Sequence, residues 1–109
     1  MNYKNNFNSS SSDFLLQKYL DLLDKGWKVN QLNHLYKEYI TKDFISSISL
    51  ANQVAVSAEK FLHHPDLKIS YGKCVIELWT HDLNTLTEKD FVLAKEIEFI
   101  ATNFIDIKK

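Results

Sequence analysis

Three histidines in the second half of the chain are the residues best suited to chemistry. His63 and His64 are adjacent and precede Pro65, and His81 follows further along the chain. Because imidazole has an unperturbed pKa of about 6.5, a histidine can give or take a proton near neutral pH. The group is therefore chemically suited to general acid–base catalysis, and these three side chains are the candidate catalytic residues.

Acidic, aromatic and small polar side chains around the histidines are the candidates for orienting groups. Glu59 lies one helical turn before His63, so it is predicted to orient that imidazole. Asp90 is the third residue of a capping pattern that starts at Thr87, which supports a structural role as well as a functional one. The predicted binding or orienting residues are Glu59, Pro65, Asp66, Tyr71, Trp79, Thr80, Asp82 and Asp90.

A zinc ion is the main alternative for three histidines, since a catalytic zinc site needs three protein ligands and one open position. Adjacent side chains point in different directions on a regular helix, so His63 and His64 are poorly placed to share an ion. We therefore expect no metal. Cys74 is the only cysteine, which excludes an internal disulfide, and it is predicted to be a small buried side chain. His34 is predicted to be structural.

The composition is typical of one folded domain. The chain has 109 residues, 45% hydrophobic and 25% charged, with a net charge of −1. All 13 basic residues are lysines that alternate with acids, which argues against a nucleic-acid partner. No apolar run approaches the roughly 20 residues that span a bilayer, and residues 1–12 lack the apolar segment of a secretory signal. We expect a cytoplasmic protein without membrane contact.

Asn and Ser dominate residues 1–12, which predicts a disordered tail before a single domain over residues 13–109. Helical and strand patterns then alternate along the domain. The expected elements are a helix from 13 to about 25, strands over 27–30 and 34–40, a helix capped by Thr41 or Asp43 that ends before Pro65, strands over 67–71 and 73–81, and a helix capped by Thr87.

The apolar spacing also predicts which faces are buried. On the central helix the predicted stripe is Phe44, Ile48, Ala51, Ala55, Ala58 and Leu62. On the last strand Cys74, Ile76 and Leu78 should face the helices, and on the last helix the stripe is Phe91, Ala94, Ile97, Ala101 and Phe104. The order predicts an α+β fold of two layers, a four-stranded antiparallel sheet with helices packed on one face.

The stretch from Ala58 to Asp90 resembles the signature of the pterin-4a-carbinolamine dehydratases. The matching positions are Glu59, His63, His64, Pro65, Tyr71, His81 and Asp90. The resemblance extends over roughly residues 14–105 and includes Gly26-Trp27 and Lys42-Asp43-Phe44. Thr41 stands where the family usually has an aromatic residue, and Thr85 stands where its loop usually has glycine.

The resemblance implies that the chain removes water from a 4a-hydroxytetrahydropterin to give the quinonoid dihydropterin, recycling the tetrahydrobiopterin cofactor of aromatic amino-acid hydroxylases. It implies no cofactor, and a homodimer or homotetramer. His63 and His81 are expected to exchange protons with the pterin while His64 holds it, and Tyr71 or Trp79 could stack on the ring or wall it.

Two other functions remain open for a chain of this kind. One is a binding module, because animal members of the family also serve as a dimerisation partner of a homeodomain transcription factor. The other is action on a different pterin, such as one of molybdenum-cofactor metabolism, although the absence of arginine offers such a phosphate-bearing ligand little anchorage.

Overall fold

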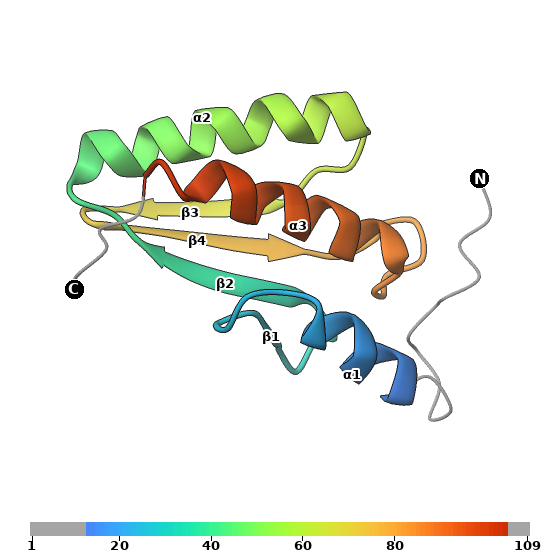
Figure 1. Cartoon of the computed structure of the whole chain (residues 1–109). Helices are drawn as coiled ribbons and strands as arrows, with labels where there is room; N and C mark the ends of the chain where they lie inside the picture. Colours follow the sequence, from blue (N-terminus) through green and yellow to red (C-terminus); the bar gives the residue numbers. More distant parts are fainter. Residues whose placement is uncertain (1–12, 105–109) are drawn as a thin grey trace.

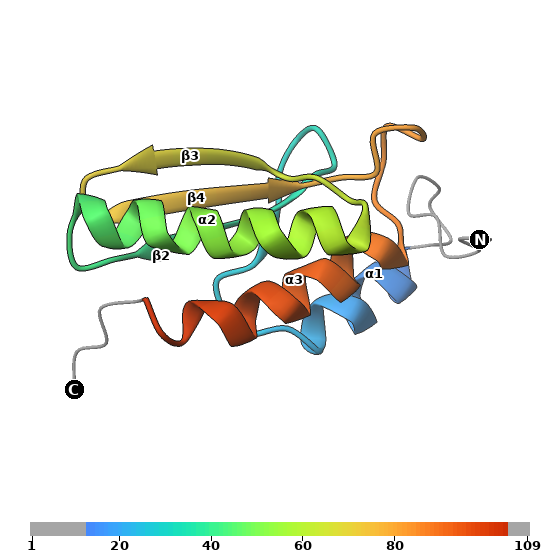
Figure 2. The ribbon, with the colours of Figure 1, turned by 90° about the horizontal axis from the view of Figure 1, so that it is seen from above.

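A four-stranded antiparallel sheet and three helices make up residues 13–104, the part of the chain that the computed structural model describes. In chain order they are α1 (Asp13–Asp21), β1 (Lys28–Val29), β2 (Leu35–Ile40), α2 (Phe44–Phe61), β3 (Asp66–Ser70), β4 (Lys73–Leu78) and α3 (Glu88–Ala101) (Figure 1). The strand order is β1-β2-β4-β3. Figure 2 shows the strands as one layer with the helices on one side, so the predicted α+β fold is confirmed. The tail predicted over residues 1–12 lies outside the described residues.

The central helix α2 has a defined cap at each end. Asp43 is its N-cap, and the Asp43 side chain accepts a hydrogen bond of 2.8 Å from the backbone N–H of Ser46. At the other end Leu62 adopts a left-handed conformation with φ of 55°, and the N–H of His63 returns to the carbonyl of Ala58. This left-handed residue turns the chain sharply and decides where the two following histidines point.

The buried face of α2 differs from the predicted stripe. Ala51 and Ala58 are buried as expected, but Phe44 and Leu62 are exposed. The residues that actually face the core are Ser47, Leu50, Ala51, Val54, Ser57 and Ala58. Because α2 packs against the sheet and α3 together, small side chains are placed where backbones approach closely, and the large ones at the ends lie outside the contact.

The core between the layers follows the predicted pattern on β4 and α3. Cys74, Ile76 and Leu78 are fully buried on the helix-facing side of β4. On α3 the residues Phe91, Ala94, Ile97 and Ala101 are buried, while Phe104 lies beyond the helix and packs only partly against the core. The capping box predicted at Thr87 is present, with Asp90 as its third residue.

Two predicted boundaries are wrong. Helix α1 ends at Asp21, and the N–H groups of Leu22 and Leu23 bond carbonyls three residues back, which tightens the chain before Gly26. Strand β4 ends at Leu78, opposite Leu35, because its partner β2 begins there. His81 therefore lies on a turn rather than on a strand.

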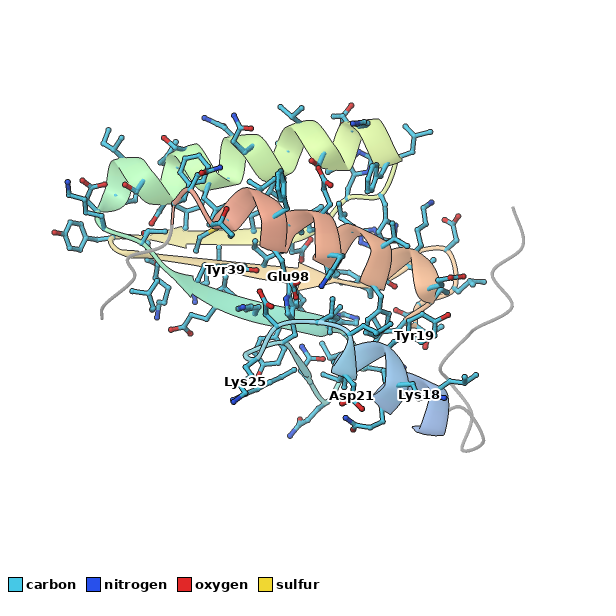
Figure 3. The ribbon with its side chains drawn as sticks, viewed as in Figure 1. Lys18, Tyr19, Asp21, Lys25, Tyr39 and Glu98 are labelled. Carbon is cyan, nitrogen blue, oxygen red and sulfur yellow. The ribbon has the colours of Figure 1, made fainter. Side chains whose placement is uncertain are left out.

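A buried carboxylate joins the end of α1 to α3. Glu98 of α3 accepts a hydrogen bond of 2.5 Å from the backbone N–H of Asp24. Lys95, one turn earlier, donates to the carbonyl of Leu22. Figure 3 shows Glu98 close to Tyr39 of β2, whose phenol pKa is raised well above its usual range by burial and then by the charge of Glu98. These contacts hold α1 beside α3, on the helical layer.

Candidate active site

His63 is buried and paired with a buried carboxylate from α3. Its Nε2 lies 2.5 Å from Oδ1 of Asp90, and only 6% of the His63 side chain and none of the Asp90 side chain is exposed. The two residues come from the exit of α2 and the first turn of α3, 27 positions apart. The left-handed Leu62 makes this pairing possible, since it turns His63 inward instead of continuing the helix.

The Asp90 carboxylate is held on its other oxygen as well. Oδ2 of Asp90 accepts hydrogen bonds from the backbone N–H of Thr87 at 3.0 Å and from the hydroxyl of Thr80 at 2.9 Å. The Thr80 oxygen lies 2.7 Å from the Thr87 hydroxyl. Because Oδ2 already accepts these two hydrogen bonds, Oδ1 is the oxygen that faces Nε2 of His63, and the carboxyl group orients that imidazole.

His64 points away from this buried pair. Its Nε2 lies 2.8 Å from Oε2 of Glu59, one turn back on α2, and both side chains are largely exposed. The expectation that Glu59 orients His63 is therefore wrong: Glu59 contacts His64, and Asp90 takes the place predicted for Glu59. The reason is the turn at Leu62, which reverses the directions that a regular helix would give the two histidines.

His81 lies on the turn after β4 and stacks on Trp79. The ring centroids of His81 and Trp79 are 4.3 Å apart with an interplanar angle of 28°. The other face of Trp79 is covered by His34, at 3.8 Å and 2°. Both faces of the indole are occupied, so the expectation that Trp79 could stack on a pterin ring is wrong.

A hollow of about 210 Å³ brings the three predicted catalytic histidines together. It is lined by Leu62, His63, His64, Thr80, His81, Asp82 and Lys89. Thr80 and Asp82, predicted from the sequence, are thus part of it. The wall is mostly polar and carries groups able to donate and accept protons, which suits a small polar heterocycle better than an apolar ligand.

Some predicted residues lie away from the hollow. Tyr71 is on the exposed turn between β3 and β4, at the opposite end of β4 from His81. Asp66 begins β3 and is exposed, and Pro65 precedes it on the link from α2. None of these three is among the residues that line the hollow.

Lys89 is a lining residue that the sequence reasoning missed. It stands in the first turn of α3, where the positive end of the helix dipole disfavours a cation. The signal in the sequence that could have indicated this residue is a lysine between the acids Glu88 and Asp90 at the start of a helix. His34 was predicted to be structural; it is buried, and its Nδ1 lies 2.6 Å from Oε2 of Glu77.

Known proteins resemble this chain in both sequence and fold. Residues 10–100 match the family profile described as pterin 4 alpha carbinolamine dehydratase. The chain belongs to this family. A crystal structure of a transcriptional coactivator/pterin dehydratase from Brucella melitensis superposes with a TM-score of 0.76 at 31% identity, covering 88% of this chain and 99% of that one.

Bacterial proteins that are similar in sequence to this chain are named as members of the same family, on a provisional basis. A pterin-4-alpha-carbinolamine dehydratase of Rickettsia canadensis is 48% identical over 83 residues, 76% of each chain. One from Nostoc punctiforme is 43% identical over 76 residues, 69% of this chain and 80% of the relative. The predicted resemblance is confirmed, and the family to which this carbinolamine dehydratase-like chain belongs consists of hydro-lyases.

Two further findings concern ions and membranes. Across residues 13–104, no group of three or more His, Cys, Asp or Glu side chains is arranged to hold a metal ion. In the same range, no helix has both the length and the apolar character to cross a bilayer.

Proposed function

We propose that the chain dehydrates 4a-hydroxytetrahydropterin to the quinonoid dihydropterin by histidine acid–base catalysis, and so recycles a tetrahydrobiopterin cofactor. The observation that carries the proposal is the buried His63–Asp90 pair, whose His63 lines one hollow together with His64 and His81. The family supplies the reaction, and the geometry supports a division of roles among the three histidines.

His63 is the proposed base. Its Nε2 proton is directed to Asp90, so in the neutral imidazole Nδ1 carries the lone pair. A buried carboxylate that fixes the tautomer also stabilises the imidazolium that forms when Nδ1 accepts a proton. This base removes the proton from N5 of the pterin.

His81 is the proposed acid. It lies on an exposed turn, so it can regain a proton from solvent after each turnover. In the reaction the C4a–O bond breaks, the hydroxyl takes the His81 proton and leaves as water, and the electron pair of the N5–H bond forms the C4a–N5 double bond. One proton is taken up by His63 and one is released by His81, so the enzyme returns to its starting state through solvent exchange.

His64, Lys89 and Asp82 are the proposed substrate-holding residues. The Glu59 carboxylate directs the Nε2 proton of His64, which orients the ring at the rim of the hollow. The Lys89 ammonium can donate to a carbonyl oxygen, and the Asp82 carboxylate can accept from ring or exocyclic N–H groups. A pterin carries both kinds of group on one edge.

An assay with freshly generated 4a-hydroxytetrahydropterin tests the function directly. The wild-type chain is expected to accelerate dehydration above the uncatalysed rate, with and without a chelator. His63→Ala and His81→Ala are expected to lower kcat more than they raise KM, and His64→Ala to act largely through KM. Wild-type kcat in the His63→Ala/His81→Ala double variant would contradict the proposed roles.

We also propose that the chain acts as a homodimer or homotetramer. The sheet ends in strands β1 and β3, whose outer edges have no partner among the described residues. Large apolar side chains are exposed on α2 and α3, among them Ile45, Val56 and Phe99. A monomeric mass at micromolar concentration in light scattering would contradict the proposal.

A further inference from the structure

The His81 ring has one direct support in the structure, the indole of Trp79. Within residues 13–104 the His81 imidazole makes no hydrogen bond or ion pair, and its residue is exposed. An exposed histidine on a turn would ordinarily sample several rotamers. The stack at 4.3 Å instead keeps the ring plane against Trp79 at a place where His81 lines the hollow.

Trp79 is itself fixed from behind. His34 stacks on the opposite face of the indole, almost parallel to it. The register of β2 and β4 explains the pairing, because Leu35 lies opposite Leu78 and one further step in each direction places His34 opposite Trp79. Both residues project from the sheet face that the helices leave uncovered, since Leu35 and Leu78 fill the core on the other face.

Hydrogen bonds with Glu77 and Asn30 hold His34 in place. Its Nδ1 lies 2.6 Å from Glu77, and Asn30 donates to the same Glu77 oxygen at 3.0 Å. The side-chain oxygen of Asn30 accepts from the backbone N–H of His34, and the backbone N–H of Asn30 donates to the His34 carbonyl. His34 is therefore immobilised at both its ring and its backbone.

We propose that Glu77, His34 and Trp79 form a positioning stack that holds the His81 ring ready for proton transfer. The proposal rests on the proposed role of His81, and Trp79 and His34 act through that residue rather than on the substrate. Trp79 is absent from the lining of the hollow, which agrees with a supporting place behind His81. The site thus combines His63, which the helical layer holds in place, with His81, which side chains on the open face of the sheet hold in place.

The test compares Trp79→Leu with Trp79→Phe, because both keep an apolar side chain and only Phe keeps an aromatic face. The interaction energy of an aromatic pair corresponds to a change of about 2- to 12-fold in a rate or equilibrium constant. Trp79→Leu is expected to lower kcat by about that factor with KM nearly unchanged, and Trp79→Phe to recover most of it. Val75→Ala, on the same face of β4 but outside the stack, is the control and should keep wild-type kcat.

A double-mutant cycle shows whether Trp79 acts through His81. In a His81→Ala background, Trp79→Leu is expected to cause no further loss of kcat. An equal loss in both backgrounds, or wild-type kcat in Trp79→Leu, would overturn the proposal.

A measurement independent of activity separates this proposal from the proposed function. The carbon-bound ring protons of His81 should resonate upfield in NMR because they lie over the indole, and the shift should disappear in Trp79→Leu and persist largely in Trp79→Phe. An unshifted His81 signal in the wild-type chain overturns the stack even if the chain dehydrates pterins. Absent dehydration with a shifted signal refutes the proposed function while the stack stands.

Discussion

Replacement of Asp90 by asparagine tests the buried centre of the site most directly. Asparagine keeps the shape of the side chain, and its carbonyl oxygen can still accept from the backbone N–H of Thr87, so the capping box of α3 survives. Its NH₂ group then faces Nε2 of His63, where the carboxylate oxygen stood at 2.5 Å. Two donors cannot share that position, so His63 must move its proton to Nδ1.

The expected cost follows from this change of tautomer. With the proton on Nδ1, the nitrogen assigned as the base no longer has a lone pair, and kcat should fall by about 10²- to 10⁴-fold, the usual contribution of a positioned acid or base. KM should change little, because neither His64 nor Lys89 is disturbed. Loss of the charge-assisted hydrogen bond should also lower the free energy of unfolding by about 1.5–3 kcal/mol.

The assay is the dehydration of freshly generated 4a-hydroxytetrahydropterin, with thermal unfolding recorded for the same preparations. Asp43→Ala is the matched control, since it removes the N-cap acid at the far end of α2 and destabilises the domain without touching a histidine. Asp43→Ala should keep wild-type kcat below its melting temperature. If Asp90→Asn retained kcat within about threefold of wild type, the reasoning about the His63 tautomer would be refuted.

Three other predictions follow from exposure and titration. Glu59→Gln should change kcat/KM by less than about fivefold, since an exposed ion pair contributes little; steady-state kinetics checks this, and a larger loss would give Glu59 a role in the chemistry. Burial raises the pKa of the Cys74 thiol, so Cys74 should react with a thiol reagent at pH 8 only after unfolding, and fast labelling of the native chain would contradict its burial. The backbone N–H of Ser46 bonded to Asp43 lowers the pKa of that carboxyl, so its stabilisation is present above the unfolded value of about 3.9 and is lost as pH falls through the lower folded pKa. Wild type should therefore lose its stability advantage over Asp43→Asn below about pH 4 in thermal melts, and an unchanged difference would refute the assignment.

The local signals of the sequence were sufficient for most of the fold. Apolar alternation in β4 and the capping box at Thr87 depend on neighbours in the chain, and both are found as predicted. The ends of the helices and strands were harder to predict from the sequence. β4 stops at Leu78 because β2 begins at Leu35 on the opposite side, and no property of residues 79–81 themselves indicates that limit.

The loop after His81 accommodates a threonine at a position where the family usually has glycine. Thr85 replaces a usual glycine, which raised the question of a positive φ that threonine resists. In the structure Asn84, with φ of 54°, takes the left-handed position, and Thr85 pairs with Thr80 in an isolated bridge. Asparagine tolerates that conformation better than β-branched residues do.

By itself, the sequence determined the element order and the family, and it singled out the three histidines that line one hollow, because these depend on residue types and spacing along one chain. Only the tertiary structure decided which carboxylate serves which histidine. The left-handed Leu62 turns His63 toward Asp90 and leaves His64 to Glu59, and the β2–β4 register sets His34 behind Trp79. Such pairings join residues up to 45 positions apart, and they depend on backbone direction and register, which helical or strand periodicity in one segment cannot specify.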